Sequence, residues 1–316
     1  MSKKTLSIVI SAYNEEGNIK ELYKELKKVT KDLPLTGTEI IFVNDGSKDK
    51  TLEYCKELQA KDPEVKIVNF AKNFGHEIAM TAGKDYAKGD AVIFMDADLQ
   101  HPPKYIKDMV NLWQNGHDIV LTKRKSNAGS SIFYKILAKS FYAVLNFLSD
   151  VRIPASSPDF RLLDRKYIEY LKEFKERDAL FRGLLSLMAT CETLATIEFV
   201  APERFSGETK YSYIKGFKLA LDSILQFSVR PLYLSLWLAV AFGVFGGGLG
   251  IYVIIERYIV KNPVPGYATI VSAVVFMGAL NLFILAIIGA YIAKIHMEAK
   301  RRPLYLAEYL EKKKGK

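Results

Sequence analysis

The sequence predicts an α/β domain with a mostly parallel sheet, followed by two membrane-spanning helices. Three observations predict this fold. Five short apolar segments within the first 125 residues read as strands, amphipathic helical patterns alternate with them, and two long uncharged stretches come later in the 316-residue chain. Strands that alternate with helices form parallel sheets whose two faces are covered by the helices.

The predicted strands are short and apolar, and polar or turn-forming residues bound them. They cover residues 6–13, 39–45, 65–70, 91–97 and 118–124. Residues 18–33 place apolar side chains at helical spacing, and residues 51–61 repeat the pattern more weakly. Farther along, residues 159–174 read as a charged cluster that continues as a helix, and residues 195–212 read as a strand followed by a basic loop.

Polar residues gather where four of the predicted strands end. They are Asn14, Glu15 and Glu16 after the first strand, Asn44 and Asp45 after the second, Lys72 and Asn73 after the third, and Asp96 and Asp98 after the fourth. In parallel sheets ligands bind beyond the carboxyl ends of the strands, so this set predicts the rim of a binding site. Residues 44–51 also fit a plain turn with a helix cap.

Asp96 and Asp98 stand two residues apart directly after a buried strand. Their side chains point the same way if the chain stays extended there. Such a pair, with Gln100 as a further oxygen ligand, suits Mg²⁺ or Mn²⁺, which would bind substrate phosphates as its remaining ligands. A metal that holds a diphosphate indicates a nucleotide-activated substrate, and the chain lacks the glycine-rich phosphate loops of NTPases and dinucleotide-binding proteins.

The two histidines beside the rim, His76 and His101, are expected to form hydrogen bonds or caps rather than to catalyse, because no nucleophile stands near them in the sequence. Cys55 and Cys191 fit no metal or disulfide spacing and are expected to be reduced, buried thiols.

Two uncharged stretches, residues 231–255 and 262–293, exceed the roughly 20 residues that a spanning helix needs. No signal peptide is expected at the N-terminus, because the first apolar run is short and acidic residues follow it. Basic residues flank both spans in the positive-inside pattern. The net charge of +10 therefore indicates anionic lipid rather than nucleic acid, and both termini are expected on the cytoplasmic side of the plasma or inner membrane.

The segment before the first span has an apolar helical face from Tyr213 onward, which favours a helix in the membrane interface over a core helix. Within the first span, Gly243 and Gly247, or Gly246 and Gly250, stand at the spacing of closely packed helices. Pairing of these helices between copies would make the protein a homo-oligomer.

Six segments, in chain order and followed by two spans, resemble the family 2 glycosyltransferases that act on polyprenyl phosphates. They are SAYNEEGNI, VNDGSKDKT, KNFGHEIAMTAG, DADLQHPP, DFRLLDR and RFSGETKYSY. The resemblance implies a GT-A type catalytic domain, which is Rossmann-like with a mostly parallel sheet. It divides the chain into a cytosolic catalytic domain over 1–210, an amphipathic juxtamembrane helix over 211–230, membrane helices over 231–257 and 266–294, and a basic cytosolic tail over 295–316.

The resemblance also implies roles for single residues. Donor-binding positions are Ala12, Tyr13, Glu15, Asp45, Lys72, Asp96, Ala97 and Arg124; metal-binding positions are Asp96, Asp98 and Gln100; acceptor or phosphate-binding positions are Arg161, Arg204, Lys210 and Lys215; and catalytic positions are Asp98 and Asp159. Lys72, Arg124 and Lys215 are assigned from their charge and position and not from the family motifs, and Lys72 and Arg124 could equally be solvated. In the basic loop this chain departs from the family pattern, because Glu208 and Thr209 follow Gly207 where one residue and a serine are usual.

The implied reaction is a single inverting displacement. A lipid phosphate oxygen attacks the anomeric carbon of a UDP-sugar, and the metal neutralises the departing diphosphate. Because a phosphate monoester has a second pKa of about 6, a general base is needed less than for a sugar hydroxyl. Asp159 matches the residue often assigned as the base, but it could also orient the acceptor or form an ion pair with Arg161.

Two rival functions share parts of this pattern. A processive polysaccharide synthase would carry a Q-x-x-R-W element and more spans, and QFSVRP at 226–231 is not that element. A membrane scaffold that only binds a nucleotide-sugar is disfavoured by the intact D-x-D. UDP-glucose is the first choice of donor by resemblance, with N-acetylglucosamine or another hexose next and GDP-mannose behind.

Overall fold

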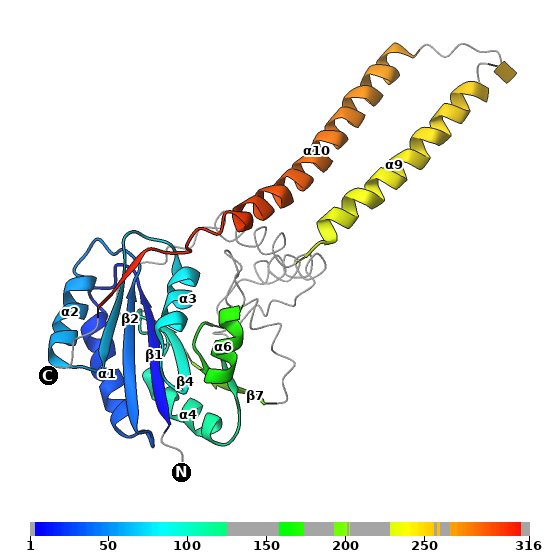
Figure 1. Cartoon of the computed structure of the whole chain (residues 1–316). Coiled ribbons are helices and arrows are strands. Elements are labelled where there is room, and N and C mark those ends of the chain that lie inside the picture. Colours follow the sequence, from blue (N-terminus) through cyan, green and yellow to red (C-terminus); the bar gives the residue numbers. More distant parts are fainter. Residues whose placement is uncertain are drawn as a thin grey trace. The chain divides into compact units, whose positions relative to one another are not determined.

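The computed structural model describes residues 4–124, 158–173, 193–200, 202, 228–255, 258–259 and 266–310. The chain divides into two compact units (Figure 1). The first consists of residues 1–138, 153–211 and 302–316, and it contains the sheet; the second consists of residues 139–152 and 212–301, and it contains two long helices. The predicted juxtamembrane helix over 211–230 lies almost wholly outside the described residues.

In the described part of the first unit, an eight-stranded sheet has the order β7-β5-β6-β4-β1-β2-β3-β8. The strands are β1 Thr5–Ala12, β2 Gly37–Asn44, β3 Val65–Phe70, β4 Ala91–Asp96, β5 Ile119–Arg124, β6 Arg161–Asp164, β7 Leu194–Phe199 and β8 Ala307–Leu310. The four central strands β4, β1, β2 and β3 are parallel, whereas β6 and β8 pair antiparallel with their neighbours. The prediction of a mostly parallel sheet is confirmed, and the five predicted strands agree within the usual uncertainty of strand ends.

Helices cover both faces of this sheet. They are α1 Ile19–Lys31, α2 Thr51–Lys61, α3 His76–Tyr86, α4 Ile106–Gln114 and α6 Arg165–Glu173, with a short 3₁₀ helix at Pro103–Tyr105. Helices α1, α2 and α4 contribute to one hydrophobic cluster with the sheet. On the other face α3 packs so closely on β1 that a Cβ at Gly83 would lie 2.0 Å from Cγ1 of Val9.

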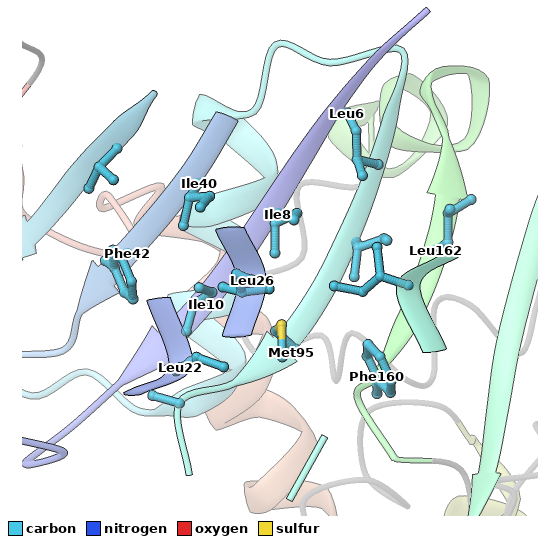
Figure 2. Packing of buried hydrophobic residues seen from close by; sticks show 14 of the residues in the cluster. Leu6, Ile8, Ile10, Leu22, Leu26, Ile40, Phe42, Met95, Phe160 and Leu162 are labelled. Atoms are coloured by element: carbon cyan, nitrogen blue, oxygen red, sulfur yellow. The ribbon is translucent and has the colours of Figure 1, made fainter. Parts of the chain in front are cut away.

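The alternation of side chains along β1 explains how the strand is buried on both faces. Leu6, Ile8 and Ile10 belong to the cluster under α1, and Figure 2 shows Ile8 and Ile10 beside Leu22 and Leu26 of that helix. Leu22 and Leu26 are one helical turn apart and both fully buried. Strands in a sheet covered on both sides read as continuous apolar runs, as these do.

One buried ion pair joins the two strands that follow the first helix. Glu39 of β2 accepts hydrogen bonds from Nζ of Lys66, from Oγ of Ser7 at 2.5 Å and from the backbone N–H of Lys88 at 2.6 Å. Burial alone would raise the pKa of Glu39, but Lys66 and the two other donors outweigh it and hold the pKa below its ordinary value. Ionised Glu39 therefore stabilises the folded state.

We expect Glu39→Gln to lower the free energy of unfolding at pH 7 by about 1.5–3 kcal/mol, since it removes a charged acceptor from a buried network. Because the pKa is lower in the folded than in the unfolded protein, this stabilisation is present above about pH 4.3 and is lost as pH falls through the folded pKa. Denaturant unfolding of the detergent-purified wild type and variant, from about pH 3 to 7, measures how this stability difference changes with pH. Glu21→Gln, in an exposed pair with Lys24, should cost less than about 0.5 kcal/mol. A pH-independent difference for Glu39→Gln would contradict the assignment.

The second unit contains α9, Arg230–Ile255, and α10, Tyr267–Ala299. Segments Arg230–Tyr252 and Ala273–Ala299 are long and apolar enough to cross a membrane. Within this unit, the rings of Phe242 and Phe276 lie 5.3 Å apart and the hydroxyl of Tyr291 donates to the Ser228 carbonyl at 2.8 Å. Most described side chains of both helices are exposed to the surroundings, as suits contact with lipid, so the protein is associated with a membrane.

The structure differs from the sequence prediction at two strands. Residues 161–164 form β6, although the charges around them read as a polar cluster. In the segment predicted as a basic tail over 295–316, α10 continues to Ala299 and residues 307–310 form β8. Each strand has four residues, too few to show a period of two, and each depends on a partner strand distant in sequence.

Candidate active site

The register of the sheet brings the ends of several strands together. Ala12 pairs with Asn44, and Ser11 pairs with Asp96, across parallel neighbours. Strand β6 runs antiparallel to β4 and begins with Arg161 opposite Phe94. The carboxyl ends of β1, β2 and β4 and the amino end of β6 therefore lie at one edge of the sheet, where a parallel sheet binds ligands.

His76, the first residue of α3, lies between two carboxylates at this edge. Its Nδ1 is 2.9 Å from Oγ of Ser11 and 3.4 Å from Oδ1 of Asp96, and its Nε2 is 3.1 Å from Oδ2 of Asp159. Burial alone lowers the pKa of His76, but the two carboxylates outweigh it and raise the pKa to about 9. The imidazole is therefore a cation at neutral pH that connects Asp96 to Asp159.

Asp159 and Arg161 form an ion pair in the protein interior. Only 3% of Asp159 and 2% of Arg161 is exposed. The guanidinium donates to Oδ1 of Asp159, and the other carboxylate oxygen faces His76. Both oxygens of Asp159 are thus engaged by cationic partners, and the ion pair that the sequence left open as one role of Asp159 is present.

Asp45 lies at the end of β2 and is held by the loop that follows β3. Its two carboxylate oxygens accept the backbone N–H groups of Phe74 and Gly75 at 2.6 and 2.9 Å. Burial raises the pKa of Asp45 above its ordinary value, against the opposing effect of these two bonds. Gly46 has φ +65°, and a Cβ there would lie 2.4 Å from the carbonyl carbon of Lys72, so the close approach of the two loops requires glycine.

The loops after β1 and β2 are joined by side-chain hydrogen bonds. The N–H of Asn14 donates to Oγ of Ser47 at 3.0 Å, and the N–H of Glu15 donates to Oγ1 of Thr51 at 2.8 Å. Asn14 has φ 55°, a left-handed conformation that asparagine tolerates better than most residues. These bonds fix the loop that carries Tyr13 and Glu15 beside Asp45.

The segment after β4 turns instead of staying extended. The strand ends at Asp96, residues 97–98 form a turn, and Leu99 has φ 61°. Asp98 is 6% exposed, and its Oδ1 accepts the N–H of Gln100 at 3.0 Å. The two aspartates are therefore presented by a turn, so the condition of an extended chain, under which their side chains would point the same way, is not met.

Metal ligation at this turn would come from few protein groups. Among the described residues, no three His, Cys, Asp or Glu side chains form a cluster that could hold a metal. Two carboxylates and an amide oxygen still suit a hard divalent cation that takes its other ligands from water and phosphate. The donor chemistry of Asp96, Asp98 and Gln100 therefore fits Mg²⁺ or Mn²⁺.

Comparison with known proteins identifies the family. The family model described as Glycosyl transferase family 2 matches residues 7–171, which include the whole site edge described above. The chain belongs to glycosyl transferase family 2. It is a glycosyltransferase with a GT-A-like α/β fold, as the resemblance implied.

Relatives resemble this glycosyltransferase over nearly its full length. It is 40% identical to the uncharacterized glycosyltransferase YkcC of Bacillus subtilis, over 96% of this chain and 93% of that protein. It is 34% identical to a prophage bactoprenol glucosyl transferase homolog of Escherichia coli, over 97% of this chain and 99% of that protein. It is 35% identical to the bactoprenol glucosyl transferase of Shigella phage SfV, over 95% of this chain and 97% of that protein. A crystal structure of S. aureus TarS with UDP-GlcNAc is 19% identical, covers 70% of this chain and 65% of that one, and has a TM-score of 0.47.

The structure locates most of the predicted site residues of the glycosyltransferase. Ala12, Asp45, Asp96, Ala97, Asp98, Asp159 and Arg161 lie on the strand ends or the segments that adjoin them, with Tyr13, Glu15 and Gln100 in the loops that follow. Nζ of Lys72 lies 5.2 Å from the Phe74 ring centroid, and Arg124 is exposed at the end of β5. Arg204, Lys210 and Lys215 lie outside the described residues.

Sequence reasoning missed the central place of His76. The sequence predicts hydrogen bonding for both rim histidines. His101 agrees with this prediction, because its Nδ1 accepts the N–H of Asp96 at 3.0 Å; its ring also stacks on that of Phe160, with centroids 5.3 Å apart. His76 also forms hydrogen bonds, to Ser11 and Asp159, and in addition it joins two carboxylates from segments more than 60 residues apart. The one available signal was its position at the start of a helix that follows a rim segment.

Proposed function

We propose that this glycosyltransferase moves one glucose from UDP-glucose to polyprenyl phosphate and so forms a polyprenyl-phosphate sugar. The observation that carries the proposal is the full-length similarity to bactoprenol glucosyl transferases, which extends through the two long apolar helices as well as the sheet domain. The polar strand ends supply groups suited to a nucleotide diphosphate, and the apolar helices supply the means to reach a lipid acceptor.

The donor side of the site is built around three aspartates. Asp45, buried and held by two N–H groups, is the candidate for binding the nucleoside, and its loop lies beside that of Tyr13 and Glu15. Asp96 and Asp98, with Gln100, would hold the divalent cation. When bound, such a cation supplies Lewis acidity and neutralises charge on the leaving diphosphate. Lys72 and Arg124 are additional candidates for contact with the diphosphate.

The acceptor side is built around Arg161 and Asp159. An acceptor phosphate oxygen forms the new bond to the anomeric carbon while the bond from that carbon to the UDP oxygen breaks, so the configuration inverts. The acceptor is already mostly dianionic at pH 7, because its second pKa is about 6. Asp159, with both oxygens engaged, orients Arg161 and His76, and these two cations would add positive charge beside the reacting phosphates. Arg204, Lys210 and Lys215 are candidates for the entering phosphate.

We expect Asp159→Asn to lower kcat roughly tenfold and to keep the acidic limb of the pH–rate profile, because an amide keeps the size of the side chain and loses the charge that orients its partners. Steady-state rates measured from about pH 5.5 to 9 give both kcat and the pH–rate profile of the variant. A loss beyond about a hundredfold, together with disappearance of the acidic limb, would instead assign Asp159 as the general base.

The membrane arrangement follows from chain connectivity. The first unit contains strands β1 to β7 from before α9 and strand β8 from after α10, which supports an even number of spans with both termini on one side. The basic flanks favour the cytoplasmic side of the plasma or inner membrane. Glycines 243, 246, 247, 248 and 250 of α9 have no heavy atom within 4 Å of an added Cβ among the described residues, which leaves room for pairing between copies in a homo-oligomer.

Product analysis tests the proposal. Membranes containing the protein are incubated with polyprenyl phosphate and, in separate reactions, with labelled UDP-glucose, UDP-N-acetylglucosamine or GDP-mannose. The masses of the lipid products are then measured by mass spectrometry. We expect UDP-glucose to be the preferred donor and the lipid to gain one hexose. A ladder of sugars would indicate a processive synthase, and binding of nucleotide-sugar without any product would indicate a scaffold.

A further inference from the structure

The last described residues of the chain pack on the catalytic domain, although they follow the second long helix in sequence. Strand β8 pairs antiparallel with β3. The N–H of Ala71 donates to the carbonyl of Leu306 at 3.0 Å and extends this pairing, and Nε2 of Gln59 donates to the carbonyl of Leu310 at 2.5 Å. We call residues 305–310 the C-terminal clamp.

Two tyrosines of the C-terminal clamp contact the end of α3 and the end of β3. The ring of Tyr305 stacks on Phe70, with centroids 5.1 Å apart, and its hydroxyl donates to Oδ2 of Asp85 at 3.0 Å. The ring of Tyr309 stacks on Tyr86, with centroids 4.6 Å apart. Burial and the carboxylate of Asp85 raise the pKa of Tyr305, so its hydroxyl remains a donor at neutral pH. The clamp thus joins the last turn of α3 to the sheet.

One aromatic contact connects the clamp to the donor side of the site. Phe70, which stacks on Tyr305, also meets the edge of Phe74 with centroids 5.5 Å apart. Phe74 and Gly75 donate their N–H groups to Asp45. The loop that holds Asp45 therefore packs on the same ring that the clamp covers.

We propose that Tyr305 and Tyr309 are positioning residues that order the donor site from the C-terminal end of the chain. The clamp braces both the loop over residues 71–75 and α3, whose first residue is His76. This inference rests on the proposed function for the identity of the donor. A loop without helix or strand must otherwise be ordered when ligand binds, at the expense of affinity.

The test compares three full-length variants in detergent or nanodiscs. Tyr305→Ala removes the ring, Tyr305→Phe keeps it, and Tyr170→Ala removes a partly exposed tyrosine on α6 that does not belong to the clamp. We expect Tyr305→Ala to raise the KM for UDP-glucose roughly two- to tenfold, the range that an aromatic pair contributes. Its kcat and acceptor KM should stay close to the wild-type values. Tyr305→Phe and Tyr170→Ala should keep the wild-type donor KM.

Hydrogen exchange provides a second measurement that does not depend on turnover. Without nucleotide, amides of residues 71–76 should exchange faster in Tyr305→Ala than in wild type, and at the wild-type rate in Tyr305→Phe. Unchanged exchange and donor KM in Tyr305→Ala would overturn the proposal. Should that variant not fold, Tyr305→Leu takes its place under the same criteria. A wild-type protein that glucosylates no polyprenyl phosphate would overturn the proposed function, while the exchange comparison would still decide the role of the clamp.

Discussion

Asp98→Ala is expected to lower kcat for glucosyl transfer by on the order of a hundred- to a thousandfold, the effect of removing a group that stabilises developing charge. The protein should remain folded and inserted in the membrane. Within the turn, Oδ1 of Asp98 accepts the N–H of Gln100, and loss of such a bond costs about 1 kcal/mol. The large effect therefore belongs to catalysis and not to folding.

Two further variants make the Asp98 experiment specific. Asp98→Asn keeps an oxygen for the turn and loses the charge, so it should be nearly as inactive as the alanine protein. Asp118→Asn changes an aspartate that precedes β5, at the opposite end of the strand from Arg124, where it accepts a hydrogen bond from Thr193; it should keep normal activity. Full activity of Asp98→Asn, or of the wild-type enzyme in EDTA, would contradict a metal at this turn.

Arg161→Met is expected to lower the free energy of unfolding by about 3 kcal/mol, because it leaves the Asp159 carboxylate buried without its guanidinium partner. His76 remains within 3.1 Å of that carboxylate, so the effect should lie at the lower end of the range for broken buried pairs. Activity should fall as well, since Arg161 holds Asp159, which also contacts His76 in the proposed site.

Denaturant unfolding of the detergent-purified protein measures the stability of the Arg161 variant. The double variant Asp159→Asn/Arg161→Met removes both charges and should recover part of the lost stability, which a double-mutant cycle would report as coupling between the two residues. Strictly additive effects of the two single changes would contradict the buried ion pair.

The parts of the fold that local patterns could predict are those with strong local signals. The central strands are continuous apolar runs because helices cover both faces of the sheet, and α1 shows a full apolar stripe at Leu22 and Leu26. Strands β6 and β8 lack such signals. Strand β6 lies between β4 and β5, and β8 pairs with β3, which is more than 200 residues away in sequence. Both strands therefore depend on partners that no local pattern identifies.

The site was predictable to the extent that topology alone assembles it. Asp45 follows β2, and Asp96 and Asp98 lie at the end of β4, the two parallel strands on either side of β1, so the alternation of strands and helices already places them at one edge. The contacts of His76 with Asp96 and Asp159 depend on where α3 begins and on how β6 enters the sheet, and neither feature has a local pattern. The turn after Asp96 likewise depends on the left-handed conformation of Leu99, and a leucine in the sequence does not predict that conformation.

A structure of the glycosyltransferase with UDP-glucose and Mn²⁺ tests the central claim most directly. Anomalous scattering from manganese would locate the ion. We expect it bound by a carboxylate oxygen of Asp98 and by oxygens of the UDP diphosphate, each at about 2.0–2.2 Å, with the glucose anomeric carbon on the side of Arg161. A donor bound at Asp45 with no ion between Asp98 and the diphosphate would contradict the account.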